Sequence, residues 1–182
     1  MSRDPRQSLA LSLSLSASGS KLNQAKSKGL WLGGWCGRTD PWATLEWSST
    51  KIKVLGVFVG IGDLDGDNWC PCIEAVDNVH KSSRSRFLSF RGKALVINTL
   101  ALSWVWYVAS LIHMPAWVAK ELSSLAFSFF WFGKRELVFC SVVIQSPLCG
   151  GFSVVNVQYK VWALLGQWVR RLVSDDRLSL SL

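Results

Sequence analysis

The most regular pattern of apolar and polar positions lies in the second half of the chain. Apolar residues recur at helical spacing from Gly92 to Met114, which predicts a helix. A second helix is expected from Pro115 to about Trp131, because proline is favoured in the first turn of a helix and Gly133 follows as a terminator. These patterns predict that the second half of the chain is mainly helical.

Shorter patterns predict the remaining elements. Residues 51–61 are rich in β-branched side chains and predict a strand, and an apolar run at 29–34 predicts another. The other expectations are a turn at 62–68, a helix at 73–83, a strand at 137–144, a turn at Gly150-Gly151, and a helix from an Asn156 N-cap to about Val173. Together they predict an α+β fold, with a small β-hairpin followed by a mainly helical region.

An uncharged run of 19 residues, Ala94–Ile112, is long enough to span a membrane. Its polar residues Thr99, Ser103 and Ser110 fall on one stripe of a helix. A striped helix is more typical of a protein core with one exposed side. A small membrane protein with one span at 94–112 therefore remains the alternative interpretation.

Composition narrows the class of partner and compartment. The net charge of +8 favours nucleic acid or acidic lipid as a partner. The eleven tryptophans must be buried, laid against a partner, or placed at a membrane surface. The five cysteines are odd in number and irregularly spaced, which is typical of a reducing compartment. We therefore expect an intracellular protein, cytoplasmic or nuclear, that is not secreted. The Leu/Ser alternation at 8–16 and 178–182 indicates low-complexity tails.

Five cations gather between residues 81 and 93 with no acid among them, and two phenylalanines, Phe87 and Phe90, lie between them. Basic side chains neutralise phosphates, and aromatic side chains stack on bases. The alternative is a solvated face before a helix, but the absence of acids favours nucleic acid. The cations of this basic cluster are Lys81, Arg84, Arg86, Arg91 and Lys93.

Three patterns imitate metal sites. The acids at 63, 65, 67 and 74 have calcium-loop spacing, but Asn68 stands where an EF-hand needs glycine. Cys70, Cys72 and His80 form at most half of a zinc site. The pair Asp175-Asp176 lies in a polar segment without flanking strands, unlike the paired aspartates of polymerases. No metal site is predicted from any of them.

A series of short motifs runs in order along the chain, and it resembles the series found in non-LTR (LINE-type) retrotransposon reverse transcriptases. The segment 19–27 is similar to the family's motif D, and Leu-Ser-x-Arg-Gly-Lys followed by Ile-Asn is the most specific match. The matching positions are Gly19, Leu22, Asn23, Lys26 and Ser27, then Lys53–Val57, Asn68-Trp69, Arg86–Asn98, Trp106-Tyr107, Pro115, Phe130–Lys134 and Gly150–Val155.

The resemblance implies an organisation and a set of contacts. After a low-complexity tail at 1–17, residues 18–67 would form a β segment at the palm edge. Residues 68–173 would form a helical thumb or connector, before a disordered tail at 174–182. Gly19, Asn23 and Lys26 would lie near the nucleotide site, and Leu55 and Gly56 near the primer strand. The basic cluster would face an RNA or DNA template–primer.

The departures from the family bear on activity. In the family, a hairpin with the sequence aromatic-x-Asp-Asp precedes motif D. In this chain, Asp4 is the single aspartate among residues 1–18, which otherwise carry the Leu/Ser tract. Ser83 and Trp104 replace a usual tryptophan and a common polar residue. We therefore expect a truncated fragment of an RNA-directed DNA polymerase that at most binds nucleic acid and lacks polymerase activity alone.

The same departures set the expected partners and cofactors. The partners would be template–primer and the missing palm and fingers, with no small-molecule ligand. No cofactor is expected in this chain, although the parent family uses Mg. A non-functional open reading frame is a further alternative.

Overall fold

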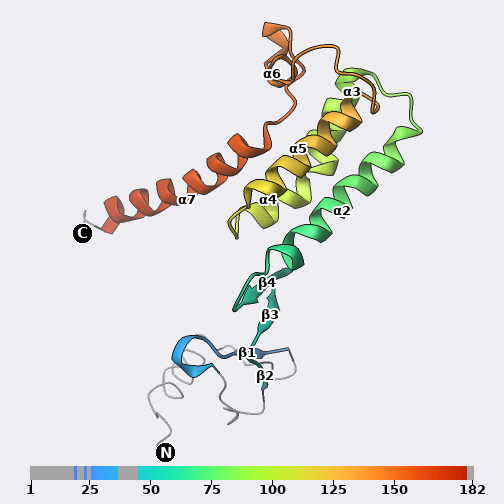
Figure 1. Cartoon of the computed structure of the whole chain (residues 1–182). Helices are drawn as coiled ribbons and strands as arrows, with labels where there is room; N and C mark the ends of the chain where they lie inside the picture. The colour runs from blue at the N-terminus through green and yellow to red at the C-terminus, as the bar shows by residue number, and fades with distance from the viewer. Residues whose placement is uncertain (1–18, 20–22, 24–25, 37–44, 180–182) are drawn as a thin grey trace, which may run out of the picture. The chain divides into compact units, whose positions relative to one another are not determined.

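A computed structural model describes residues 19, 23, 26–36 and 45–179. The chain divides into two compact units, Met1–Leu64 and Asp65–Leu182. Figure 1 shows short strands in the first unit and helices in the second. The observed fold is therefore α+β, as the sequence predicted.

The first unit contains two small sheets of two strands each. Strands β1 (Lys28–Leu30) and β2 (Glu46–Ser48) pair in parallel, and the 3₁₀ turn η1 (Gly33–Trp35) follows β1. The strand expected at 29–34 is therefore shorter than predicted. Trp47 lies opposite Gly29, and a Cβ at Gly29 would clash with the Trp47 ring. Only glycine fits there without displacing that ring.

The single strand expected at 51–61 is instead a hairpin. Strands β3 (Lys51–Val54) and β4 (Val57–Gly60) pair antiparallel, with Val54 opposite Val57. The turn residues Leu55 and Gly56 have φ values of 51° and 88°. Two positive φ angles give the twist that a two-residue hairpin turn needs. The interpretation missed this turn because leucine is rare at positive φ.

All the regular elements in the described part of the second unit are helices. Its elements are α2 (Asp65–Arg84), α3 (Phe90–Leu95), the π-helix η2 (Val96–Ala101), α4 (Ser103–Ala109), α5 (Ala116–Phe130), α6 (Cys140–Ile144), the 3₁₀ turn η3 (Pro147–Cys149) and α7 (Val157–Ser179). Helix α2 packs against α5 and α4, as Figure 1 shows. Their facing side chains form the core.

The core explains which positions of these helices are apolar. Val76 of α2, Ile97 of η2, Val105 of α4, and Val118 and Leu122 of α5 are fully buried. Burying one such side chain stabilises a fold by roughly 1.5–3 kcal/mol. The five lie on four different elements, so their burial holds the helices of this unit together.

Several predicted boundaries in this unit were wrong. The helix expected from Gly92 to Met114 is divided into α3, η2 and α4. Helix α2 begins at Asp65, inside the expected turn, and continues through Pro71. Acidic side chains in the first turn of α2 and basic side chains in its last turn both interact favourably with the helix dipole. Helix α7 extends to Ser179, so residues 174–179 are helical rather than part of a tail.

The strand expected at 137–144 is also wrong, because residues 140–144 form helix α6. The carbonyl of Val143 accepts hydrogen bonds from the backbone N–H groups of Phe152 (3.0 Å) and Val154 (3.3 Å). The Val143 side chain is buried. Packing of the returning chain therefore overrides the β propensity of the Val-Val-Ile run.

The predicted start of the last helix and end of α5 are confirmed. The Asn156 side chain accepts a hydrogen bond from the Tyr159 N–H at 3.1 Å and caps α7. Pro115 directly precedes α5, and Gly133 lies beyond its end with a φ of 68°. The Gly133 N–H donates to the Ser128 carbonyl at 2.8 Å, which satisfies a carbonyl of the last turn.

In the part of the chain that the structure describes, no helix has the length and apolarity to cross a membrane. The run 94–112 is split among three elements. Its polar stripe behaves as predicted at Thr99 and Ser103, which are exposed, while Ile97 and Val105 are buried. The membrane alternative is not favoured.

Candidate nucleic-acid interface

The basic cluster surrounds the tight connection between α2 and α3. The Arg86 N–H donates to the Ser83 carbonyl at 3.2 Å, and the Leu88 N–H donates to the Arg86 carbonyl at 2.8 Å. Ser89 caps α3, because its hydroxyl oxygen accepts from the Gly92 N–H at 3.3 Å. These local bonds fix the direction in which the connection leaves α2 and enters α3.

Four of the five cations point to solvent. Lys81, Arg84, Arg86 and Arg91 are exposed. The Lys81 ammonium forms an ion pair with Asp77 at 2.5 Å, one helical turn earlier. An exposed pair of this kind contributes little stability, and it offsets part of the charge of Lys81. The three arginines therefore dominate the positive surface.

The two phenylalanines of the cluster have different environments. Phe87 is fully exposed in the connection. Phe90 is 40% exposed, but its ring also packs among aromatic side chains, with centroids 5.3 Å from Phe130, 5.6 Å from Trp131 and 5.7 Å from Phe152. Phe90 is thus part of the fold, whereas the Phe87 ring is open to a partner.

Lys93 is buried, unlike the other four cations. Its ammonium donates to the Phe130 carbonyl at 2.7 Å and lies 3.2 Å from the centroid of the Phe132 ring. Burial lowers the pKa of Lys93, and the nearby Lys134 lowers it further. The hydrogen bond satisfies a carbonyl that the last turn of α5 leaves without a helical partner. Lys93 has no surface in this structure with which to contact a phosphate.

His80 is also buried, one turn before Arg84 on α2. Its ring stacks on Phe129 with a centroid distance of 4.5 Å, and neither ring nitrogen has a hydrogen-bond partner. Burial lowers the pKa of His80 to about 4, against an opposing effect of Asp77. His80 is therefore neutral at physiological pH and serves the packing of α2 on α5.

Most of the residues that imitated metal sites lie in helix α2, whereas Asp63 precedes it and Asp175-Asp176 belong to α7. Asp65, Asp67 and Glu74 belong to α2, as do Cys70, Cys72 and His80. The Cys72 thiol donates to the Asn68 carbonyl at 3.3 Å, and burial raises its pKa. Among the residues that the structure describes, no group of three or more His, Cys, Asp or Glu side chains could hold a metal ion.

The remaining predicted site residues lie in the strand unit. The Lys26 N–H donates to the Asn23 carbonyl (3.1 Å) and to its side-chain oxygen (3.2 Å), which forms a turn before β1. Gly19 has a φ of 66°, and Leu55 and Gly56 form the tip of the β3–β4 hairpin. Leu22 falls outside the described residues.

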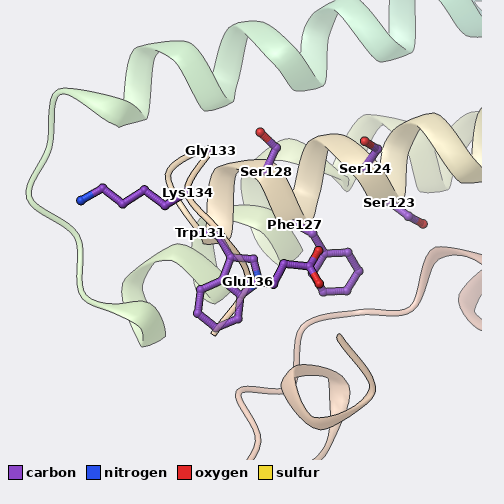
Figure 2. A pocket seen from close by; sticks show the side chains of 8 residues that line it. All are labelled: Ser123, Ser124, Phe127, Ser128, Trp131, Gly133, Lys134 and Glu136. Carbon is purple, nitrogen blue, oxygen red and sulfur yellow. The ribbon is translucent and has the colours of Figure 1, made fainter. Parts of the chain in front are cut away.

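Sequence reasoning missed a hollow beside the end of α5. One wall is the polar face of α5, and the other is the turn that follows it (Figure 2). The only signal in the sequence is the spacing of the serines on α5, which share one helical face. The lining residues are Ser123, Ser124, Phe127, Ser128, Trp131, Gly133, Lys134 and Glu136.

Comparison with known proteins gives a transposon protein as a relative. No protein-family model matches the chain. Over 166 residues, which are 88% of this chain, it is 31% identical to the "Transposon TX1 uncharacterized 149 kDa protein" of Xenopus laevis. The chain spans 12% of the length of that protein. The similarity indicates a transposon-related origin for this chain.

Proposed function

We propose that this chain is part of a LINE-type reverse transcriptase and that its helical unit binds the backbone of an RNA or DNA template–primer. Two observations support the origin. The chain is similar to a transposon protein over 88% of its length. Its short motifs also follow the order of the reverse-transcriptase family, from the motif-D-like segment to Gly150-Gly151. The five free cysteines fit a site of action inside the cell, in cytoplasm or nucleus.

The observation that carries the binding proposal is the fully exposed Phe87 ring among exposed arginines. An exposed phenylalanine at the tip of a connection gains nothing from the fold, so its apolar surface is available to a partner. A base stacks on such a ring, while guanidinium groups on either side neutralise the adjoining phosphates. This combination is typical of sites for single-stranded nucleic acid.

The five cations of the cluster have unequal roles in this proposal. Arg84, Arg86 and Arg91 supply the phosphate contacts, and Lys81 supplies a weaker one because Asp77 shares its charge. Lys93 acts indirectly, by joining α3 to the end of α5 beneath the surface. We therefore expect Lys93 to affect stability rather than affinity.

The strand unit has a proposed role only within the longer protein. There, Gly19, Asn23 and Lys26 would lie near the nucleotide, and Leu55 and Gly56 near the primer strand. Lys26 is exposed and follows a hydrogen-bonded turn, which suits a residue that reaches toward a phosphate. Magnesium would be bound by the polymerase centre of that longer protein, and this chain supplies no proposed ligand to it.

The test is the salt dependence of binding to a single-stranded oligonucleotide. Affinity should fall steeply as salt rises, and Arg91→Gln should reduce the slope of log affinity against log salt by about 0.7. Phe87→Ala should weaken binding about tenfold with an unchanged slope, because stacking releases no counterions. Phe139→Ala is the matched control, because Phe139 is exposed but lies outside the cluster. Equal affinity at low and high salt would overturn the proposal.

A further inference from the structure

The turn after α5 places a phenylalanine in a strained backbone conformation. Phe132 has a φ of 58°, in the left-handed region, and Gly133 follows with a φ of 68°. The Gly133 N–H donates to the Ser128 carbonyl at 2.8 Å, so the way in which the helix ends imposes this backbone. A helix end of this kind usually has glycine at the first left-handed position, because a bulky side chain is strained there. In this chain a phenylalanine occupies that position and the glycine comes one residue later.

The Phe132 ring covers a buried cation. The Lys93 ammonium lies 3.2 Å from the centroid of the ring, and a cation over a ring face is attracted to it. Lys93 is 1% exposed, whereas Phe132 is 45% exposed. Because the ammonium is buried and the ring against it is exposed, the ring lies between the ammonium and solvent. The open surface of the ring therefore faces away from Lys93.

This open surface lies beside the basic cluster. Lys93 belongs to α3, two residues after the exposed Arg91, so its contact with Phe132 brings the turn after α5 next to α3. Lys134, in the same turn, is close enough to lower the pKa of Lys93. Lys134 and Arg135 are both exposed. The turn therefore adds two cations to the surface that carries Arg91.

The charges of the turn indicate which ligand suits the ring. Glu136 is the single acid between residues 122 and 174, and its carboxylate accepts a weak hydrogen bond from the Cys140 thiol at 3.6 Å. Two cations against one acid leave the turn positive. A nucleobase with its phosphate matches this combination, because the base stacks on a ring while the phosphate pairs with a cation.

We propose that the exposed face of Phe132 is a second stacking platform for a base of the nucleic-acid strand, in addition to Phe87. Lys134 and Arg135 neutralise the phosphate beside that base. The hydrogen-bonded turn and the Lys93 side chain beneath the ring hold Phe132 in place before a base arrives, so little freedom is lost on binding. This inference rests on the proposed function, because it presumes that a strand lies along the basic surface.

The experiment measures the affinity of the full chain for two single strands of equal length at one low salt concentration. One strand is oligothymidine, and the other has the same sugar–phosphate backbone without bases. Phe132→Leu should weaken binding to oligothymidine about fivefold, because leucine still covers Lys93 but offers no ring to a base. The variant and the wild type should bind the abasic strand equally, because that strand has no base to stack.

Two further variants separate stacking from the covering of Lys93. Phe132→Tyr keeps an aromatic ring and should bind oligothymidine like the wild type. Phe139→Leu is the matched control, because Phe139 is also an exposed phenylalanine but lies beyond the turn, at the N-cap of α6. It should bind both strands like the wild type. Denaturant titration of each variant shows the fraction that is folded under the binding conditions.

The outcomes separate this inference from the proposed function. If Phe132→Leu binds oligothymidine as tightly as the wild type, or loses affinity for both strands alike, Phe132 serves only to cover Lys93 and the stacking site is wrong. A Phe132→Tyr variant as weak as Phe132→Leu would overturn it as well. In these cases, salt-sensitive binding that Phe87→Ala weakens leaves the proposed function standing. If the wild type binds neither strand in a salt-sensitive way, the proposed function itself fails.

Discussion

The strand unit and the helical unit differ in what holds them together. In the described part of the strand unit, Val57 is the one apolar side chain of the core, whereas the helical unit buries apolar side chains from Trp69 to Val161. The strand unit relies instead on local interactions, such as the stacking of Trp31 on Trp47 with ring centroids 4.1 Å apart. Sheets of two strands are marginal in water without a covering layer. Most of the stability should therefore reside in the helices.

The same difference bears on function. In the helical unit a core holds the surface in place, so an exposed ring such as Phe87 and the nearby hollow keep a fixed geometry. In the strand unit, Asn23 and Lys26 lie in a turn before β1, and Leu55 and Gly56 lie at a hairpin tip, where local hydrogen bonds rather than a packed core support them. Recognition that depends on geometry is thus expected from the helical unit.

The largest expected effect comes from the core of the helical unit. Leu122→Ala should lower the free energy of unfolding by about 4 kcal/mol, because Leu122 is fully buried and its loss leaves a cavity. Leu55→Ala, at the exposed hairpin tip, should change it by less than about 0.5 kcal/mol. Denaturant titration of both variants measures the contrast. Similar losses in the two would mean that the units share stability equally.

Acid should destabilise the helical unit through His80. The pKa of His80 is about 4 in the fold and 6.5 in the reference state, so between these pH values the unfolded chain binds a proton that the fold excludes. The contribution of neutral His80 to the free energy of unfolding is therefore fully present above pH 6.5. It falls by about 3 kcal/mol as the pH drops to 4. His80→Leu should remove this part of the pH dependence. A wild-type pH profile that matches the variant would refute the assignment.

A substitution at Lys93 should change the stability of the fold without changing nucleic-acid binding. Lys93→Met should cost about 2 kcal/mol, because it removes a charged hydrogen bond and leaves the Phe130 carbonyl unsatisfied. The salt dependence of nucleic-acid binding should stay unchanged, since the ammonium is buried. Arg91→Met should do the reverse, with little loss of stability and a shallower salt slope. A shallower slope in Lys93→Met would show that Lys93 reaches the strand.

The smallest expected effect is a gain in the stability of the strand unit. Leu55 has a φ of 51°, a conformation that costs a residue with a side chain about 1 kcal/mol. Leu55→Gly should therefore stabilise the hairpin by up to that amount, and amide hydrogen exchange of residues 51–60 would report it. A destabilised hairpin would mean that the Leu55 side chain makes contacts that outweigh its backbone strain.

Sequence patterns were most informative where local chemistry decides the structure. Pro115 and Asn156 marked helix starts correctly because an N-terminal proline and a side-chain cap act within a few residues. The patterns failed where distant contacts decide. Residues 140–144 are helical where the N–H groups of Phe152 and Val154 bind the Val143 carbonyl, and nothing between 137 and 144 indicates this.

The sequence predicted which residue types make up the candidate site, but not which of their side chains are exposed. The excess of cations and the two phenylalanines were visible in the sequence, but the division between exposed Phe87 and packed Phe90 was not. Burial of Lys93 depends on the Phe130 carbonyl, 37 residues away. The hollow was missed because it lies between the end of α5 and the turn that follows, so Trp131 and Glu136 line it only once the chain has folded back. Pairings of this kind leave no periodic signal.

The most direct test of the central claim is photochemical cross-linking of the full chain to a single strand that carries 4-thiouridine, with the adducts mapped by mass spectrometry. The account predicts that adducts concentrate on the peptide that contains Phe87 and that 1 M salt abolishes them. Adducts confined to the strand unit, at Trp31 or Trp47, would contradict the claim that the helical unit is the nucleic-acid interface.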